Sequence, residues 1–326
     1  MYKISVVIPC YNLGHYLDAC LDSIARQPVG KVEYIFINDG STDETLPKLK
    51  SFCEERTSYC NIIDQCNSGV SAARNAAINV CNGEYIYILD GDDILTVSAI
   101  EDMLNDIEIS DADMIISNVI LLKASGEEEL LRLPIKTGIY SPKELFRSVK
   151  VFPTIPQNLY RTEIVKQQRL TFDKNLKYGE VYEFTLKFLC YAKNVYVSDS
   201  CFFKYVMRGG SATHSPNFSK DLTILDTLKK YNQVGRGFHN YSSFKVTALR
   251  MLLAFSYNKY AKLRISSPEA LKNITRIFEN EEVQRLCREV YSSSNSPIKE
   301  RILALYCKTT GVKGYKFLVK LLKILK

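Results

Sequence analysis

The sequence has no Cys-x-x-Cys pair, and its ten cysteines are irregularly spaced. No secretory leader begins at Met1, so we expect reduced thiols in a cytoplasmic protein and neither a disulfide scaffold nor a zinc site. No apolar run approaches the ~20 residues of a membrane-spanning helix, so we expect no bilayer crossing. Neither G-x-G-x-x-G nor a Walker loop is present, which argues against a dinucleotide oxidoreductase or another nucleotide-using enzyme with these phosphate-binding loops.

The composition predicts a globular protein with a large core, because 46% of the 326 residues are hydrophobic and 24% are charged. The net charge of +7 is unevenly divided. Residues 1–214 contain 22 Lys and Arg against 28 Asp and Glu, whereas residues 215–326 contain 21 against 8. We therefore predict two domains, 1–214 and 215–326, that face different partners.

Short apolar runs alternate with amphipathic helical patterns in the first part of the chain. Strands are predicted at residues 3–8, 32–37, 61–63 and 84–89, and helices at 13–24, from 41, 70–81 and 98–108. A capping box is predicted at Ser41–Glu44 and a helix cap at Ser141–Glu144. Later segments suggest a hairpin near Ser125-Gly126, a helix at 179–191, a strand at 195–206, and helices after Pro216.

This alternation predicts an α/β fold with a mostly parallel sheet and helices on both faces. Ligands of such sheets bind beyond the carboxyl ends of the strands. The polar clusters of the first half, at residues 9–12, 38–43 and 90–93, all lie at such ends. That shared position is the first functional signal.

The third cluster places three carboxylates, Asp90, Asp92 and Asp93, within four positions. Their mutual repulsion must be offset by a cation, by strong donors or by solvation. Hard oxygen ligands suit Mg²⁺ or Mn²⁺, which typically take one or two protein carboxylates together with water and substrate phosphate. A solvated acidic turn before the next helix is the alternative.

Four ordered segments give this pattern a context: 4–12 (ISVVIPCYN), 35–43 (IFINDGSTD), 67–75 (NSGVSAARN) and 87–93 (YILDGDD). Together they resemble the inverting family 2 glycosyltransferases, strongly over residues 3–120 and more weakly to 214. The resemblance implies a GT-A fold, which is a Rossmann-like, mostly parallel sheet flanked by helices, followed here by an α-helical C-terminal region.

The resemblance also implies a UDP-sugar donor bound near the first two polar clusters. In relatives, the segment matching Pro9, Tyr11 and Asn12 lies against the uracil, and the aspartate matching Asp39 accepts from the base or ribose. Tyr11 also offers an aromatic face for stacking. The alternatives are an ordinary loop tyrosine, and a tight turn at residues 38–40.

For the remaining donor contacts, the resemblance assigns Arg74 to nucleotide binding, Asp90 to the ribose and Asp92 to the metal ion. Asp93 is left with a supporting role in its loop. For Arg74, a surface salt bridge is the alternative.

The reaction implied is a single displacement, in which a carboxylate removes a proton from the acceptor hydroxyl and Mg²⁺ or Mn²⁺ stabilises the departing diphosphate. Family members usually supply that base as the aspartate of a Gly-Glu-Asp stretch. The corresponding residues here are Gly179-Glu180-Val181, and valine cannot accept a proton. We predict Glu180 as the base, with Glu183, one turn later, or an inactive site as the alternatives.

A loop at residues 205–215 contains Arg208 and His214. The family often closes a basic or histidine-bearing loop over the diphosphate, so we predict Arg208 as a phosphate contact and His214 as a further metal ligand. A plain surface histidine is the alternative.

The last 16 residues, 311–326, place lysines along one helical face and leucines along the other. Such a helix suits an anionic membrane surface, which would place the protein peripherally at the inner face of the cell membrane. A final helix docked on its own domain is the alternative. No nucleic-acid partner is expected, because the aromatics of this basic region form no recognisable stacking platform.

These observations lead to one prediction and one competitor. The prediction is an inverting, metal-dependent glycosyltransferase that moves a sugar from a UDP-sugar to a glycan or lipid-linked acceptor in cell-surface polysaccharide biosynthesis. The competitor is a nucleotide-sugar-binding partner subunit that has lost catalysis through Val181.

Overall fold

The computed structural model describes residues 2–56, 58–148, 157–176, 179–207, 276–277, 279–292 and 304, with the side chains of 146–148 excepted. The chain forms two compact units. The first, which we call the sheet unit, contains Met1–Leu145, Pro153–Lys174 and Lys187–Gly209. The second unit contains Phe146–Phe152, Asn175–Leu186 and Gly210–Lys326. The predicted boundary between residues 214 and 215 lies outside the described residues.

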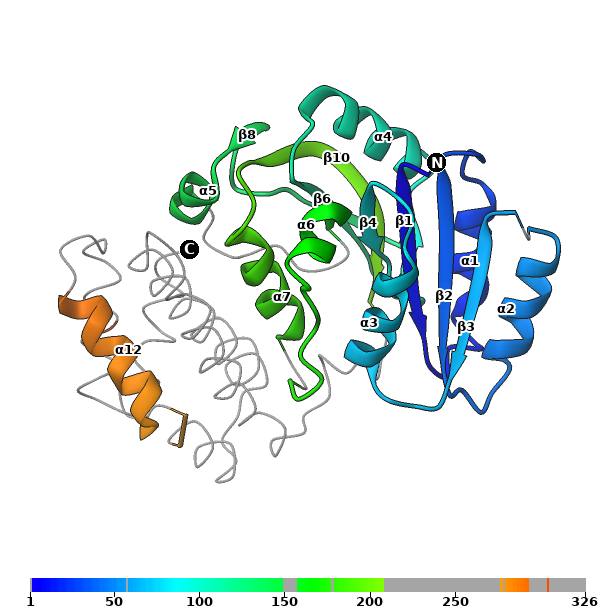
Figure 1. Cartoon of the computed structure of the whole chain (residues 1–326), viewed down its shortest axis with the longest axis horizontal. Helices are drawn as coiled ribbons and strands as arrows, with labels where there is room; N and C mark the ends of the chain where they lie inside the picture. Colours follow the sequence, from blue (N-terminus) through cyan, green and yellow to red (C-terminus); the bar gives the residue numbers. More distant parts are fainter. Residues whose placement is uncertain are drawn as a thin grey trace. The chain divides into compact units, whose positions relative to one another are not determined.

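The sheet unit contains ten strands among its described residues (Figure 1). They are β1 (Ile4–Cys10), β2 (Val32–Asp39), β3 (Cys60–Gln65), β4 (Tyr85–Ile88), β5 (Ile94–Leu95), β6 (Met114–Leu122), β7 (Glu128–Leu131), β8 (Gly138–Tyr140), β9 (Asn158–Arg161) and β10 (Val195–Val206). The described helices of the chain are α1 (Leu17–Ala25), α2 (Thr45–Glu54), α3 (Val70–Val80), α4 (Ala99–Ser110), α5 (Pro142–Ser148), α6 (Thr162–Gln167), α7 (Glu180–Leu189) and α12 (Glu281–Ser292). Helices α5 and α7 each contribute residues to both units.

The sheet has the strand order β3-β2-β1-β4-β9-β6-β10-β5, with β7 paired to β6 and β8 paired to β10. The first four strands of this order are parallel, as predicted. Strand β9 then runs antiparallel between β4 and β6, so the sheet as a whole is mixed. The carboxyl ends of β1, β2 and β4 consequently meet at one edge.

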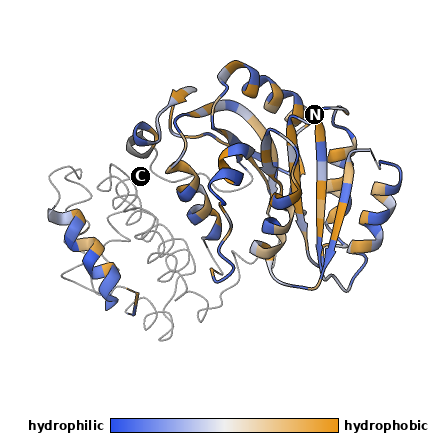
Figure 2. Ribbon diagram, viewed as in Figure 1, coloured by the Kyte–Doolittle hydropathy of each residue, from blue (hydrophilic) through white to orange (hydrophobic). Residues whose placement is uncertain are grey.

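Strands β1, β2 and β4 are buried on both faces of the sheet, and they are apolar over much of their length (Figure 2). Even-numbered residues of β1 and β2 pack in one cluster with apolar residues of α1, α2 and α4. Helix α3 packs against β1 and β2. Since successive side chains of a strand point to opposite faces, residues such as Val7 and Ile35 face away from that cluster. This two-sided burial explains why these strands read as continuous apolar runs.

Pro9 does not end the first strand, contrary to the expectation from sequence. It lies within β1, in register with Ile37 of β2. Tyr85 and Leu89 donate to the carbonyls of Lys3 and Val7, so odd-numbered residues of β1 direct their backbone groups toward β4. The β1–β4 ladder ends at Val7, and the missing N–H of Pro9 therefore costs no ladder bond.

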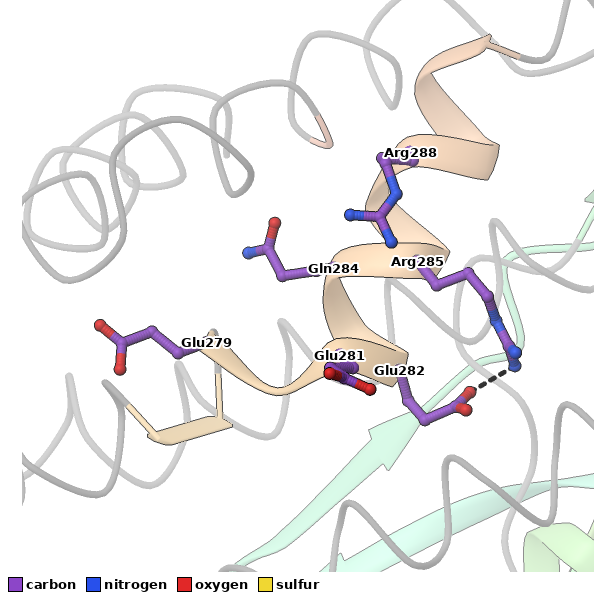
Figure 3. A pocket seen from close by; sticks show the side chains of 6 residues that line it. All are labelled: Glu279, Glu281, Glu282, Gln284, Arg285 and Arg288. Carbon is purple, nitrogen blue, oxygen red and sulfur yellow. Dashed lines mark hydrogen bonds and ion pairs between the residues drawn. The ribbon is translucent and has the colours of Figure 1, made fainter.

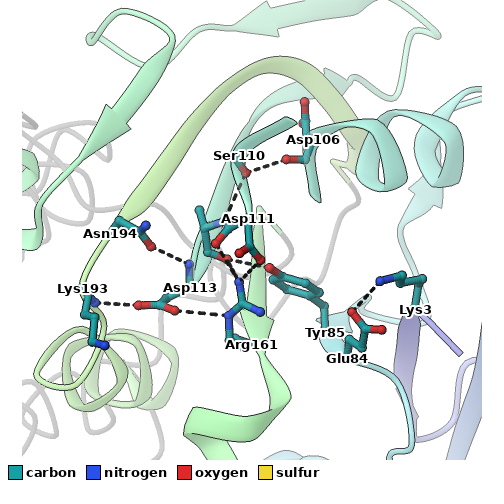
Figure 4. A network of polar contacts seen from close by, with 11 residues as sticks. Lys3, Glu84, Tyr85, Asp106, Ser110, Asp111, Asp113, Arg161, Lys193 and Asn194 are labelled. Atoms are coloured by element: carbon teal, nitrogen blue, oxygen red, sulfur yellow. Dashed lines mark hydrogen bonds and ion pairs between the residues drawn. The ribbon is translucent and has the colours of Figure 1, made fainter. Parts of the chain in front are cut away.

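The opposite edge of the sheet is held by a polar network centred on Arg161 (Figure 4). Its Nη2 donates at 2.7 Å to both the carbonyl and a carboxylate oxygen of Asp111, and its Nε donates to Asp113 at 3.2 Å. The guanidinium also lies 5.0 Å from the centroid of the Tyr85 ring. Asp113 in turn accepts from the backbone N–H of Lys193 at 2.7 Å. The network joins the starts of β4, β6 and β10 to the end of β9.

The sequence predicted two helix caps and one hairpin, and the structure confirms one of the caps and the hairpin. The capping box at Ser41–Glu44 is wrong, because the Ser41 hydroxyl accepts from the backbone of Asn12. The N–H of Thr45, where α2 starts, donates instead to the Asp43 side chain. The cap at Ser141–Glu144 is confirmed, since each residue's side chain binds the other's backbone N–H. The hairpin near Ser125-Gly126 is confirmed as the β6–β7 pair.

Within the second unit, α12 buries an apolar stripe of Val283, Leu286, Cys287 and Val290. Its polar residues line a hollow of about 410 Å³ together with Glu279 (Figure 3), and Arg285 pairs there with Glu282. None of the helices in the described ranges combines the length and apolarity needed to span a membrane.

Candidate functional site

The polar clusters predicted from sequence are brought together at the carboxyl edge of β1, β2 and β4, where the loops are packed tightly against one another. A Cβ on Gly40 would lie 2.5 Å from the backbone nitrogen of Asn67, and Gly40 has a φ of +71°. A Cβ on Gly91 would lie 2.8 Å from Leu13 and 3.0 Å from Cys10. Both glycines are therefore required by close approach, and the loops form one continuous surface.

The loop after β1 is hydrogen bonded to the loop after β2. Asn12 adopts a left-handed conformation with a φ of 51°, and its side-chain oxygen accepts from the N–H of Thr42 at 2.9 Å. The N–H of Gly14 donates to Asp43 at 2.9 Å. These bonds leave Tyr11, which lies between β1 and Asn12, 49% exposed at the rim.

Asp39, the last residue of β2, is 3% exposed and accepts three hydrogen bonds. Its Oδ1 accepts from the Gln65 side chain at 2.7 Å and from the N–H of Ser68 at 2.9 Å. Its Oδ2 accepts from the N–H of Gly69 at 2.8 Å. The carboxylate thus fixes the loop before α3, and further lone pairs of Oδ2 remain for a ligand donor.

The three carboxylates Asp90, Asp92 and Asp93 have different surroundings. Asp90 forms an ion pair with Arg74 of α3, and its Oδ1 lies 2.9 Å from the arginine Nη2. Asp93 is 2% exposed and its Oδ1 accepts from the N–H of Val206 at 3.0 Å. Asp92 is half-buried beside them. The repulsion among the three carboxylates is thus reduced by a buried arginine and by a backbone donor.

Buried neutral groups lie close to the triplet. Burial raises the pKa of the Cys10 thiol well above its usual range, and the carboxylates of Asp92 and Asp90 raise it further. Burial likewise raises the pKa of the Tyr87 hydroxyl, and the carboxylates of Asp93 and Asp90 raise this pKa further. Both side chains therefore remain protonated at neutral pH, and they add no charge to the site.

Arg74 is 4% exposed, so its ion pair is buried. The alternative considered from sequence was a salt bridge at the surface. Its guanidinium carbon lies 5.4 Å from the centroid of the Phe172 ring. Sequence reasoning missed Phe172, because it lies in an irregular segment 82 positions beyond Asp90 and no local motif marks it. It also missed the roles of Gln65 and Ser68 in holding Asp39.

The predicted catalytic residues lie on α7, in the part that belongs to the second unit. Glu180 is the first residue of the helix and is half-buried, whereas Glu183 is 4% exposed. The N–H of Glu183 donates to the carbonyl of Gly179 at 3.0 Å. Arg208 and His214 lie outside the described residues.

The carboxylates at this edge could take part in binding a divalent metal ion only together with other ligands. Across the described ranges, no three His, Cys, Asp or Glu side chains come together as a metal-binding group. Mg²⁺ and Mn²⁺ bound with nucleotide substrates need only one or two protein carboxylates, because phosphate and water supply the other ligands. The half-buried Asp92, with Asp90 close by, fits that kind of site and does not form an all-protein cage.

Comparisons with known proteins bear on the family and the fold of the chain. The sequence profile of the family described as "Glycosyl transferase family 2" matches residues 5–167. The glycosyltransferase EpsJ of Bacillus subtilis (strain 168) is 25% identical over 246 residues, which are 73% of this chain and 70% of EpsJ. A poly(ribitol-phosphate) beta-glucosyltransferase of Bacillus spizizenii is 29% identical over 209 residues, which are 63% of this chain but only 32% of that relative.

Among solved structures, TarS residues 1–349 of Staphylococcus aureus in complex with UDP superposes with a TM-score of 0.71 at 21% identity, over 99% of this chain and 92% of that one. The same TarS fragment with UDP-GlcNAc gives a TM-score of 0.69. At this identity the likeness shows a shared fold, the GT-A fold.

Proposed function

The chain belongs to glycosyl transferase family 2, and from this premise we propose that it is an inverting, metal-dependent enzyme that transfers a sugar from a UDP-sugar to a hydroxyl of a glycan or lipid-linked acceptor. The observation that carries the proposal is the grouping of Tyr11, Asp39, the Arg74–Asp90 pair and Asp92 at one sheet edge. An exposed aromatic ring, acceptors for sugar hydroxyls and a metal-binding carboxylate are the groups that a nucleoside diphosphate requires.

UDP as the nucleotide is supported by TarS, which shares the fold and has been solved with UDP and with UDP-GlcNAc. A polysaccharide acceptor is supported by the relatives named for poly(ribitol-phosphate). We therefore place the enzyme in cell-surface polysaccharide biosynthesis.

Tyr11 would stack on the uracil, with Pro9 and Asn12 shaping the same loop, and Asp39 would accept from the base or ribose through Oδ2. Asp90, whose charge is offset by Arg74, would accept from the ribose hydroxyls. A Mg²⁺ or Mn²⁺ ion held by Asp92 would stabilise the negative charge of the departing diphosphate. Arg208 and His214 are proposed as a phosphate contact and a further metal ligand.

Glu180 is proposed as the general base. A base must come within hydrogen-bond reach of the acceptor hydroxyl, and Glu180 is half-buried at the first turn of α7, whereas Glu183 is almost fully covered. Glu180 would take the proton of the acceptor hydroxyl as its oxygen attacks the anomeric carbon. The bond from that carbon to the diphosphate oxygen would break in the same step, so UDP leaves and the centre is inverted.

The test is a panel of nucleotide sugars screened by thermal shift, with and without Mn²⁺, followed by transfer assays with the donors that bind. We expect UDP-sugars to stabilise the protein more than GDP- or dTDP-sugars, and Mn²⁺ to increase the shift. An Asp92→Asn variant should lose the effect of Mn²⁺, while Asp18→Asn, an exposed aspartate on α1, should retain it. Equal shifts for all donors, or an Asp92→Asn variant that responds normally to Mn²⁺, would contradict the proposal.

A second candidate function is favoured by Val181, which stands where the family usually has its catalytic aspartate. In this alternative the chain is a partner subunit that binds the donor without turnover. Donor binding together with neither transfer nor release of the sugar, in a purified sample supplied with acceptor, would favour it.

Membrane association is proposed through residues 311–326, which lie outside the described residues. The lysines would contact anionic headgroups, and the leucines would enter the interface. Co-sedimentation with liposomes containing anionic lipid should fall when 311–326 are deleted, and unchanged co-sedimentation would remove this segment from the role.

A further inference from the structure

An irregular segment of the chain is fastened to α3 next to the donor-site arginine. The side-chain amide of Asn75 donates to the carbonyl of Phe172 at 2.9 Å, and the N–H of Phe172 donates to the Asn75 side-chain oxygen at 2.8 Å. Nearby, Lys187 donates to the carbonyl of Thr171. Two reciprocal bonds to one backbone residue fix both the position and the orientation of Phe172, which is 1% exposed.

The Phe172 ring then contacts Arg74, the neighbour of Asn75 in α3. The guanidinium carbon lies 5.4 Å from the ring centroid, within the ~6 Å over which a cation is attracted to an aromatic face. The Nη2 atom of the same guanidinium binds Asp90 at 2.9 Å. The arginine is therefore held from two sides, by the ring and by the carboxylate.

We propose that Phe172, fastened by Asn75, is a positioning residue that holds Arg74 in its donor-binding orientation before the nucleotide arrives. An arginine side chain has many rotamers, and fixing one of them when the nucleotide binds costs free energy. The contact with the ring fixes the rotamer before binding, so that cost is reduced. This inference rests on the proposed function for the role of Arg74, and it adds the residues that set its orientation.

The proposal is first tested without a nucleotide, through the side-chain Nε–Hε resonance of Arg74 in ¹⁵N-labelled protein, assigned by its loss in Arg74→Met. Phe172→Leu keeps an apolar side chain but removes the ring. We expect hydrogen exchange at this site to accelerate about tenfold, since the guanidinium then lacks its contact with the ring. Phe36→Leu is the matched control, because Phe36 is equally buried but belongs to the cluster on the face covered by α1, α2 and α4. Unchanged exchange in Phe172→Leu would overturn the proposal.

The second measurement is UDP affinity by calorimetry, together with the KM and kcat of the donor. Phe172→Leu should weaken UDP binding by roughly three- to tenfold and raise KM without lowering kcat, which is the pattern expected when binding is lost equally in the ground state and the transition state. Asn75→Ala should act in the same direction, and it serves as the second variant if Phe172→Leu does not fold. Phe36→Leu should leave affinity unchanged.

A double-mutant cycle separates positioning from general packing. If Phe172 acts through Arg74, Phe172→Leu has no further effect on UDP affinity in an Arg74→Met background. An undiminished effect in that background, or an equal loss in Phe36→Leu, would contradict the inference. If the wild-type protein binds no UDP, the proposed donor fails, and the exchange measurement alone decides the role of Phe172.

Discussion

Asp106 of α4 gives a prediction about stability that can be worked through in numbers. The side chain is 3% exposed, and its Oδ2 has no hydrogen-bond partner within the described part of the chain. The pKa of Asp106 is raised from 3.8 to about 6, and burial is the largest cause. Within that shift, a hydrogen bond with Ser198 lowers the pKa, and the nearby carboxylates Asp102 and Asp199 raise it. The charged form is thus disfavoured in the folded protein.

The sign of the effect follows from the raised pKa. Protonated Asp106 stabilises the fold below its ordinary value of 3.8, and this contribution is lost as pH rises through about 6. The whole shift corresponds to ~3 kcal/mol, of which ~1.4 kcal/mol is lost between about pH 5 and pH 7.5. Asp106→Asn has no charge to bury, so its stability relative to wild type should rise by that amount over this interval.

The assay is urea unfolding at the two pH values, followed by circular dichroism because the chain has no tryptophan. Glu108→Gln is the control, since Glu108 is exposed on the same helix and its replacement should leave the pH dependence unchanged. A stability difference between Asp106→Asn and wild type that is the same at both pH values would refute the reasoning.

Three further predictions concern the site and its support. Gly40→Ala should lose UDP binding and destabilise the fold by about 1–3 kcal/mol in urea unfolding, whereas Gly126→Ala, which has a similar positive φ but open space around it, should keep UDP binding and lose less stability. Glu180→Gln should lower the transfer rate by at least ~100-fold while UDP affinity in calorimetry stays unchanged, and retained transfer would remove Glu180 from the role of base. Arg161→Ala should cost about 1–3 kcal/mol in urea unfolding but leave UDP affinity intact, because its network holds the opposite edge of the sheet; a loss of affinity would contradict that separation.

The first half of the fold could be predicted because each strand is short, apolar and followed by a helix with one apolar face. The 195–206 strand was predicted with its observed bounds as β10. Strand β9 was not predicted, and it runs antiparallel to its two neighbours in the centre of the sheet. It has only four residues, Asn158–Arg161, and their pairing with β4 and β6 depends on partners that are distant in sequence.

The edge at which the candidate site lies could be predicted from residue order alone, because parallel strands end together. The surroundings and contacts of each residue within the site could not be predicted in this way. That Arg74 is buried, that Asp93 binds the end of β10 and that Phe172 contacts Arg74 all depend on contacts across long stretches of sequence. The Ser41 capping box failed for the same reason, since Asn12 binds that hydroxyl from another loop.

The central claim is that the edge formed by Tyr11, Asp39, Asp90 and Asp92 binds the diphosphate of a nucleotide sugar through a divalent ion. The most direct measurement is a crystal structure with UDP and Mn²⁺, with the metal located by its anomalous scattering. We predict a manganese peak at Asp92, shared with the diphosphate, and the uracil beside Tyr11. UDP bound elsewhere on the protein, or a manganese peak away from Asp92, would contradict it.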